Sequence, residues 1–592
     1  MPMIVQKFGG TSVADSQKIL AAARRAIRAH QEGNQVVMVV SAMGHNTDLL
    51  VDLAHEITDQ PPAREMDMLL STGEQVSVAL MAMAIHSLGV EAISFTGAQI
   101  GIKTDSTHTK ARIQSISTER MRQALDAGKI VIAAGFQGID EDYNITTLGR
   151  GGSDTTAVAL AAVLAADACE IYTDVDGVYT TDPRLLPEAR RMRSVSYDEM
   201  LELASLGAGV MHNRSIEFAK KFSVPIHVRS SFSDVRGTMI TSQPEAPDVA
   251  VAGAALAKNE ARVTVIGVPD KPGACFAIFS KIAAANISVD MIVQNVGAGG
   301  IADIAFTVVR DDLKATLKAV EQAAAQLGAK GVTHSDDVAK VSAVGLGMAR
   351  QTGVAQKMFR ALADAEVNIQ MISTSEIKIS ALVDRQAAPA ALQAVHRAFA
   401  LDREPPGAHD YDWSAAGRRK SSDALAVVSR LQKMEDLTID DITLDETQSR
   451  LTVAGVQNQP GAAAAIFEAV SGAGIFVDMI VQSFGADETA SISFTAPSAQ
   501  HDQAVALLAA LAKKIRCGPV SSSQRVARLS ILGVGMRSHS AVAIRTFESL
   551  ASAGVNVDMI NTSEVRLNVV VDGRHGRTAL EALQRAFAEN CR

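Results

Sequence analysis

The sequence predicts an α/β protein in which an α/β/α sandwich is followed by four ferredoxin-like βαββαβ modules. Three observations lead to this prediction. Short apolar runs alternate with helical patterns through the first 240 residues, as in a mainly parallel sheet. The segments that begin at Val263 and Leu451 are similar and lie 188 positions apart, so a long block is present twice. Each copy repeats one strand and helix pattern two times.

Composition and charge narrow the classes of function. A chain of 592 residues is too long for one core, and a net charge of −9 argues against a nucleic-acid partner. The longest apolar helix-like stretch, around 155–166, is too short to cross a bilayer, and the N-terminus does not resemble a secretory signal, so we expect no membrane association. The four cysteines are scattered, with no CxxC pair, which predicts a cytoplasmic protein without a structural metal.

The N-terminal stretch MPMIVQKFGGTSVADSQKIL has the pattern of an anion site. The apolar run 3–5 indicates a buried strand with Lys7 near its end, and Gly9 and Gly10 let the backbone approach another group closely. A helix is predicted over 13–27, capped by one of two hydroxyl side chains, Thr11 or Ser12. An ordinary strand-to-helix turn with a surface lysine fits this stretch equally well.

Further strands are predicted over 36–40, 92–95, 130–134, 168–172 and 225–228, with helices between them. Polar clusters follow the strand ends, where open α/β sheets bind ligands. Singly, each has a structural explanation: Glu74 favours a helix N-terminus, Asp154 is a cap, and Asp174 and Asp182 are turn residues. Together they predict a binding site at one edge of the sheet.

The duplicated block gives the pattern of its modules. In the first module, a strand from Val263 leads to the turn PDKPG, and apolar residues at helical spacing follow it. Strands over 287–293 and 304–309 and a helix over 313–327 complete a βαββαβ unit. The pattern resembles the ACT domain family, small modules that bind amino acids between paired copies.

The resemblance gives these expected domains: a catalytic domain at 1–245, a first ACT domain at 263–337, a second at 249–262 plus 338–402, a linker at 403–436, a third at 451–525 and a fourth at 437–450 plus 526–592. The segments 249–256 and 437–444 are expected to join the sheets of the second and fourth modules.

The N-terminal motifs resemble those of the aspartate kinases, which have the amino acid kinase (carbamate kinase-like) fold and carry ACT domains. They are KFGGTSV, SAMG, LLSTGE, GRGGSDTTA, YTDVDGVYTTDPR and VRSSF, in the order of that family. The resemblance implies transfer of phosphate from ATP to the side-chain carboxylate of L-aspartate, giving 4-phospho-L-aspartate. This is the first step towards lysine, threonine and methionine. An aspartate carboxylate is already ionised at neutral pH, so the reaction needs no general base.

The same resemblance assigns roles to residues. Lys7 and Asp154 are the expected catalytic pair, with Asp154 orienting Lys7. The expected aspartate pocket is Ser41, Thr47, Glu74, Arg150 and Ser153. The expected ATP contacts are Lys7, Phe8, Gly9, Gly10, Thr173, Asp174, Tyr179, Asp182 and Arg184. Mg²⁺ is expected on the ATP phosphates, with few protein ligands. One position departs from the family: Gly209 in GAGVMH stands where many relatives have lysine or glutamine.

Lysine, threonine or both are implied as inhibitors that bind between paired ACT modules. The expected effector residues are Asp270, Val289, Asp290 and Gln294 in the first module, and Asn368, Ile369, Ser375 and Glu376 in its partner, taken to be the second. Gln482 and Asn556 are their counterparts in the other copy. Because Asp270 becomes Asn458 after 188 positions, we hypothesise that the first pair holds the stronger site. Paired ACT sheets also suggest a homodimer.

Two alternatives remain at this stage. The first is another amino acid kinase, acting on glutamate or acetylglutamate, against which the ACT modules and the contexts of Glu74 and Arg150 argue. The second is a catalytically inactive ACT-type amino-acid sensor. The joint presence of Lys7, Glu74, Arg150 and Asp154 argues against an inactive domain.

Overall fold

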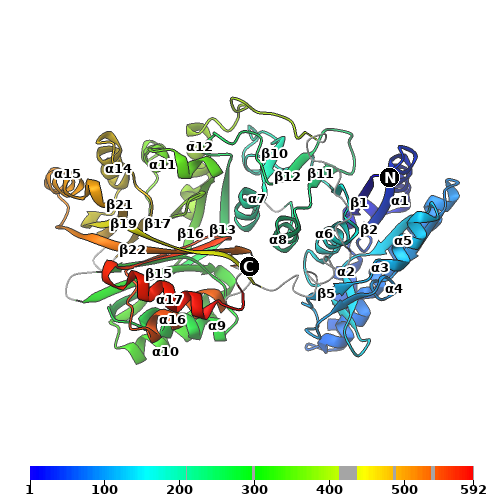
Figure 1. Ribbon diagram of the computed structural model, residues 1–592, viewed down its shortest axis with the longest axis horizontal. Coiled ribbons are helices and arrows are strands. Elements are labelled where there is room, and N and C mark those ends of the chain that lie inside the picture. Colours follow the sequence, from blue (N-terminus) through cyan, green and yellow to red (C-terminus); the bar gives the residue numbers. More distant parts are fainter. Residues whose placement is uncertain are drawn as a thin grey trace.

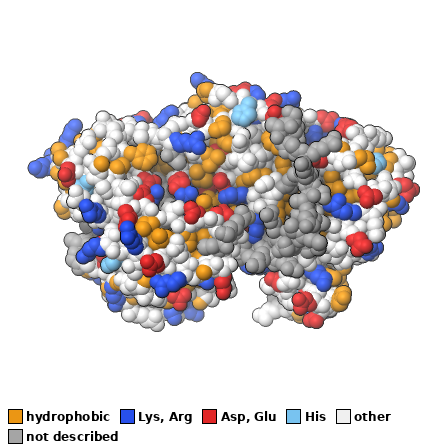
Figure 2. All heavy atoms as spheres, viewed as in Figure 1, with side chains coloured by type: hydrophobic (Ala, Val, Ile, Leu, Met, Phe, Trp, Pro, Cys, Tyr) orange, Lys and Arg blue, Asp and Glu red, His pale blue; other side chains and the backbone are white. Residues whose placement is uncertain are grey.

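The computed structural model describes residues 1–207, 210–296, 300–412, 437–484, 489–534, 536 and 541–590. Gly209 and most of the expected linker, 413–436, lie outside the described residues. An N-terminal domain (residues 1–245) lies beside a C-terminal block (residues 253–590), as Figure 1 shows. On the face drawn in Figure 2, acidic and basic side chains are interspersed over both parts, and a notch separates their lower ends.

The N-terminal domain is built on an eight-stranded sheet with the order β10-β12-β11-β9-β1-β2-β6-β3. Only the β11–β12 pairing is antiparallel. The strands are β1 (Met3–Phe8), β2 (Gln35–Val40), β3 (Ala92–Phe95), β6 (Ile130–Ala134), β9 (Ala168–Thr173), β10 (Ser194–Ser196), β11 (Ile226–Ser230) and β12 (Thr238–Thr241). Their carboxyl ends place the segments after β1, β2, β6 and β9 along one edge.

Helices cover both faces of this sheet, which gives the expected α/β/α sandwich. One core packs α1 (Ser16–Gln31) and α3 (Ala63–Ser87) on the sheet. The other packs α5 (Glu119–Asp126), α6 (Gly152–Leu164), α7 (Tyr197–Ser205) and α8 (Asn213–Phe222) on the opposite face. Helices α2 (Asn46–Ile57) and α4 (Gly97–Ile100) and a small sheet complete the domain; its strands are β4 (Ile102–Thr104), β5 (Ile113–Ile116), β7 (Gln137–Ile139) and β8 (Ile145–Thr147).

Two local expectations in this domain were wrong. The first helix is capped by Asp15, whose carboxylate accepts a hydrogen bond from the N–H of Lys18, because a 3₁₀ turn at Gly10–Val13 precedes it. The longest apolar helix is α3 rather than the stretch 155–166. Among the described residues α3 alone has the length and composition of a membrane-crossing helix. It packs one face on the eight-stranded sheet and buries the carboxylates of Asp67 and Glu74.

The C-terminal block contains one twelve-stranded sheet with helices on both sides (Figure 1). Its first copy comprises β13 (Gly253–Pro269), α9 (Ala274–Ala284), β14 (Val289–Val296), β15 (Ile301–Val309), α10 (Leu313–Leu327), β16 (Gly331–Val344), α11 (Val354–Asp364), β17 (Met371–Thr374), β18 (Lys378–Asp384) and α12 (Ala388–Ala398). Its second copy comprises β19 (Thr438–Gln457), α14 (Ala462–Gly472), β20 (Ile480–Phe484), β21 (Thr489–Pro497), α15 (His501–Lys514), β22 (Val520–Val534), α16 (Ala541–Ser552), β23 (Met559–Thr562), β24 (Arg566–Asp572) and α17 (Gly576–Ala586).

Long strands link the modules within each copy. β13 pairs with β16 over residues 253–266, and its first residues, 253–257, face the part of β16 that belongs to the second module. Residues 260–269 of β13 also pair with β15 of the first module. In the second copy β19 pairs in the same way with β22 over residues 438–453 and with β21 over residues 448–457. Each of these long strands therefore runs through both modules of its copy, which fixes the two modules relative to each other.

The modules pair between copies rather than within them. β17 of the second module pairs with β20 of the third, and β14 of the first lies beside β23 of the fourth. The apolar cores agree, since α11 and α14 share one cluster and α9 and α16 share another. A central cluster contains one methionine from each module, Met291, Met371, Met479 and Met559. The expected pairing of the first module with the second was wrong.

Candidate active site and effector sites

The centre of the candidate active site is an ion pair between β1 and α6. Lys7 Nζ lies 2.5 Å from Asp154 Oδ1, and each side chain is 12% exposed. Asp154 is in the first turn of α6, and a Cβ on Gly9 would lie 3.6 Å from the Lys7 ammonium. The structure thus brings together the two residues expected to be catalytic. The ammonium also adjoins the N-terminus of a helix, which favours anions.

Gly10 allows the segment after β2 to approach this point. A Cβ on Gly10 would lie 2.8 Å from the carbonyl oxygen of Ala42, and the Gly44 N–H donates to the Gly10 carbonyl at 3.0 Å. Phe8 faces the other way. Its ring stacks on Tyr172 in the core with 4.7 Å between centroids. The side chain of Phe8 therefore lies in the core, and only its main chain lies at this edge, so a contact with ATP would be made by the main chain.

Glu74 lies inside α3 rather than at its start, and it is 4% exposed. Its Oε1 accepts a hydrogen bond from the N–H of Ala42 at 3.2 Å. Its Oε2 is buried and has no hydrogen-bond partner among the described residues. Burial raises the pKa of this carboxyl to about 7, although the Ala42 hydrogen bond lowers it in part. A cationic ligand would supply the missing partner.

Other expected aspartate contacts surround this edge. Ser41 donates its N–H to the carbonyl of Phe8, and Thr47 lies in the first turn of α2. Ser153 is buried at the start of α6, where a Cβ on Gly135 would lie 2.7 Å from its Oγ. Arg150 is exposed and borders, with Asp154, an open cleft of about 680 Å³. A guanidinium at the mouth of this cleft can bind a carboxylate bidentately.

The expected nucleotide residues divide into two groups. Thr173 and Asp174 follow β9 beside β1, and Thr173 donates its hydroxyl to Asp174 at 3.1 Å. The backbone of Tyr179 forms an isolated antiparallel β-bridge with that of Arg191, further along the loop. Asp182 and Arg184 bind each other through several hydrogen bonds, which lower the pKa of Asp182 and raise that of Arg184.

Sequence reasoning missed several residues that hold this edge in place. Asp67 is fully buried on α3, two turns before Glu74, and binds His108 Nδ1 at 2.7 Å and Thr147 Oγ1 at 2.5 Å. Arg214 of α8 donates to the carbonyl oxygens of Leu148 and Ala111. The seven-residue spacing from Asp67 to Glu74 was a usable signal, since both face one side of a helix. Arg214 is distant in sequence from the turn that it holds.

The expected effector residues lie at two interfaces between copies. In the first–fourth interface, Asp270 Oδ1 accepts from Asn556 Nδ2 at 2.7 Å, and Gln294 donates to the Val557 carbonyl at 2.7 Å. In the second–third interface, Asn368 donates to Asn458, and Gln482 donates to the Ile369 carbonyl at 2.9 Å. Asn368 and Ile369 therefore do not face Asp270, because each copy supplies the partner of the other.

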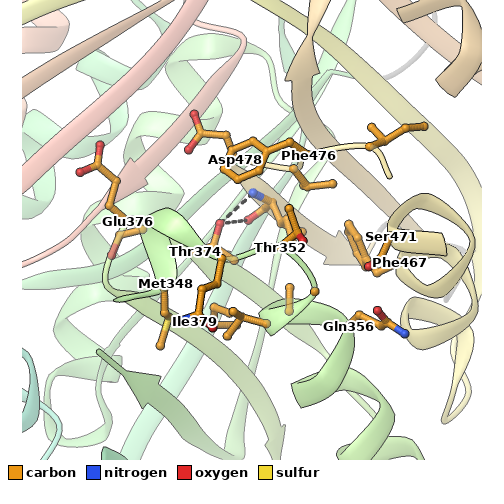
Figure 3. A pocket seen from close by; sticks show the side chains of 18 of the residues that line it. Met348, Thr352, Gln356, Thr374, Glu376, Ile379, Phe467, Ser471, Phe476 and Asp478 are labelled. Carbon is orange, nitrogen blue, oxygen red and sulfur yellow. Dashed lines mark hydrogen bonds between the residues drawn. The ribbon is translucent and has the colours of Figure 1, made fainter. Parts of the chain in front are cut away.

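The two interfaces differ in their cavities and buried charges. Between the second and third modules there is a cavity of about 410 Å³, with Ser375, Glu376 and Asp478 in its lining; Figure 3 shows Glu376 and Asp478 at the same end. Between the first and fourth modules the corresponding cavity is about 90 Å³ and includes Val289 and Asp290 in its lining. Asp290 is bound to the buried Lys340 at 2.5 Å, whereas Asp478 is bound to Arg528.

Comparisons with known proteins agree with this architecture. Residues 2–230 match the amino acid kinase family, and residues 262–325, 341–399, 451–511 and 529–587 match ACT domains. The aspartate kinase of Stutzerimonas stutzeri is 51% identical over 404 residues, 68% of this chain and 98% of that protein. The Pseudomonas aeruginosa aspartokinase is 51% identical over 405 residues, with the same two coverages.

Solved structures give the same result. The aspartate kinase of Synechocystis is 41% identical, with a TM-score of 0.52, and the match covers 99% of this chain and 98% of that one. E. coli aspartokinase III in complex with aspartate and ADP is 26% identical with a TM-score of 0.57, covering 67% of this chain and 99% of that one. Fold and site thus define an amino acid kinase with ACT modules. Within that class, the chain belongs to the aspartate kinase family.

Proposed function

We propose that this protein is an aspartate kinase, which transfers the γ-phosphoryl group of ATP to the side-chain carboxylate of L-aspartate. The observation that carries the proposal is the Lys7–Asp154 ion pair at the sheet edge where Glu74 holds a buried oxygen without a partner among the described residues. The first group suits a phosphoryl group and the second suits an ammonium. Both are needed when an amino acid is phosphorylated.

The chemistry is mainly positioning and charge neutralisation. The aspartate side chain is ionised at neutral pH, so it attacks without a base, and the barrier arises from bringing two anions together. Lys7 reduces this repulsion at the phosphoryl group, and Asp154 holds the Lys7 ammonium in place. Glu74 binds the substrate ammonium, and Arg150 binds its α-carboxylate. Ser41, Thr47 and Ser153 complete the pocket.

ATP is the proposed phosphoryl donor, bound along Gly9, Gly10 and the loop that follows β9. A solved relative, E. coli aspartokinase III, is described in complex with aspartate and ADP. Mg²⁺ is the proposed cofactor, carried by the phosphates of ATP and completed by water. The described residues contain no group of three or more His, Cys, Asp or Glu side chains that could hold a metal ion, and an ion on ATP needs no such group.

Feedback inhibition by lysine, threonine or both is the proposed role of the ACT modules, in a pathway towards lysine, threonine and methionine. E. coli aspartokinase III is described in complex with lysine and aspartate in a T-state. Both module interfaces of this chain hold buried polar residues fit for an amino acid, and their different cavities imply different selectivity. We also propose that the enzyme acts in the cytoplasm as a homodimer.

The direct test is phosphoryl transfer by the purified protein with Mg-ATP and L-aspartate, with the acyl phosphate trapped as a hydroxamate. We expect hydroxamate with aspartate, none with glutamate or acetylglutamate, and less when lysine or threonine is added. Product with glutamate or acetylglutamate but not aspartate would replace this substrate assignment. No product in any mixture, together with calorimetric binding of lysine or threonine, would establish the inactive sensor instead.

A further inference from the structure

The C-terminal block contacts the N-terminal domain through buried carboxylates on α7. Glu199 accepts a hydrogen bond from the N–H of Leu346 at 3.0 Å. Glu202, fully buried, accepts from the N–H of Glu564 at 3.0 Å and binds Lys378 Nζ at 2.7 Å. The second and fourth modules are thus anchored to one helix of the kinase domain, and the loop between β23 and β24 that contains Glu564 is held against it.

The side chain of Glu564 borders two spaces. It is 2% exposed, and its Oε2 accepts a hydrogen bond from Asn213 Nδ2 at 3.1 Å. It lines the cavity between the first and fourth modules together with Asp290. It also lines the cleft that Arg150 and Asp154 border. A single carboxylate of the fourth module therefore adjoins both an effector cavity and the active-site cleft.

Asn213 leads from this carboxylate to the substrate turn. It is the first residue of α8, and the next residue, Arg214, donates to the Leu148 carbonyl at 2.7 Å and the Ala111 carbonyl at 2.8 Å. Leu148 lies two positions before Arg150. The same end of α8 touches the turn directly, since a Cβ on Gly151 would lie 2.4 Å from the His212 Cβ. Displacement of Asn213 would move the segment that carries Arg150.

In the described part of the chain, the equivalent glutamate of the other copy does not make this connection. Glu376 lies 188 positions before Glu564 and lines the second–third cavity, but it forms an ion pair with Arg566 of the fourth module. Arg566 also lines the first–fourth cavity. The two copies have thus diverged in what their equivalent glutamates hold.

We propose that Glu564 is a positioning residue for aspartate binding, which acts through Asn213 and Arg214 on the turn that carries Arg150. A ligand in the first–fourth cavity acts on the kinase site through this carboxylate. This proposal rests on the aspartate kinase function and adds the route by which one module interface controls it.

The test uses Glu564→Ala, Asn213→Ala and the double variant in the full-length protein. Glu581→Gln, which removes a charge from the exposed face of α17 in the same module, is the control. We expect each single variant to raise the aspartate KM roughly three- to tenfold and to leave the ATP KM within about twofold. The aspartate KM of the double variant should not exceed that of the more impaired single variant, because both substitutions break the same link. An unchanged aspartate KM, or additive effects, would overturn the proposal.

Effector binding gives a second readout. Asn213 does not line the first–fourth cavity as described, so Asn213→Ala should still bind lysine or threonine there by calorimetry, while that ligand no longer raises the aspartate KM. By linkage, aspartate should also cease to weaken binding of that ligand. Full inhibition in Asn213→Ala would refute the route. If the wild-type protein forms no hydroxamate at all, the kinase function itself is refuted instead.

Discussion

Lys7 carries the positive charge that the phosphoryl group meets. Replacing it by alanine removes that charge and leaves Asp154 without its partner, while β1 keeps its backbone pairing. We expect Lys7→Ala to lower kcat by about 10²–10³, the usual cost of removing one preorganised electrostatic group. Hydroxamate formation measures kcat, and circular dichroism shows whether the fold remains. Turnover equal to wild type would show that another group neutralises the phosphate.

Glu74 predicts a pH dependence of aspartate binding. Its pKa of about 7 means that the carboxyl is mostly neutral below pH 7 and ionised above it, and only the ionised form attracts an ammonium. We expect kcat/KM for aspartate to fall roughly tenfold between pH 8 and pH 6, since this parameter reports pKa values of the free enzyme.

Glu74→Gln is the matched variant for this profile. It should lower kcat/KM for aspartate at pH 8 and abolish the dependence near pH 7, with the ATP KM little changed. A profile that keeps its inflection in Glu74→Gln would assign the titration to another group.

Asp270 and Asn458 test the difference between the two effector interfaces. Asp270 binds Asn556 with a carboxylate, whereas Asn458 binds Asn368 with an amide. A carboxylate attracts the ammonium of an effector more strongly. We expect Asp270→Asn to raise the half-inhibitory concentration of lysine or threonine more than Asn458→Ala does. Equal shifts in the two variants would mean that both interfaces contribute alike.

At the scale of elements, the start of α6 depends on Gly151. This residue has a φ of +73°, and a Cβ there would lie 2.4 Å from the Cβ of His212. The positive φ alone costs a non-glycine residue about 1–2 kcal/mol. We expect Gly151→Ala to lower the midpoint of thermal unfolding and to raise the aspartate KM, because the turn carries Arg150. Gly128→Ala is the control, since it has a positive φ but no atom within 4 Å of the Cβ.

The elements themselves were largely readable from the sequence. The strands at 92–95 and 130–134 and the helix at 313–327 have the predicted bounds, because buried strands and amphipathic helices leave clear periodicities. The cap at Asp15 was missed, since a 3₁₀ turn delays the helix by a few residues. Local competition between hydroxyl and carboxylate caps is not resolved by pattern alone.

For the whole molecule, the pairing of ACT modules within one chain removes the original argument for a dimer. An exposed apolar surface of the N-terminal domain supports a dimer instead. Leu49, Leu53 and Ile57 on α2 and Val76, Leu80 and Met83 on α3 are 38–87% exposed, and the two helices are in contact. Apolar residues at helical spacing on an exposed face usually mark an interface. A second copy, docked through the same helices, would cover this face.

This dimer is testable by mass. Light scattering should give twice the chain mass of 62.3 kDa for the wild type and the single mass for Leu53→Glu combined with Met83→Glu. Val309→Glu, at an exposed apolar position in the C-terminal block, should remain dimeric. A double variant that stays dimeric would place the interface elsewhere, and a monomeric wild type would exclude the homodimer.

The sequence by itself determined the class of fold, the duplication and the residue types at the strand ends, because periodicity and local motifs are encoded over short stretches. The resemblance of its motifs to those of the aspartate kinases placed Lys7 and Asp154 in one site before any distance was known. Tertiary structure alone decided which modules face each other, that Glu74 is buried with an oxygen that has no partner in the described part of the chain, and that Glu564 reaches the kinase domain. Those features depend on contacts between residues hundreds of positions apart, and equivalent residues in two similar copies carry no sign of which partner each will meet.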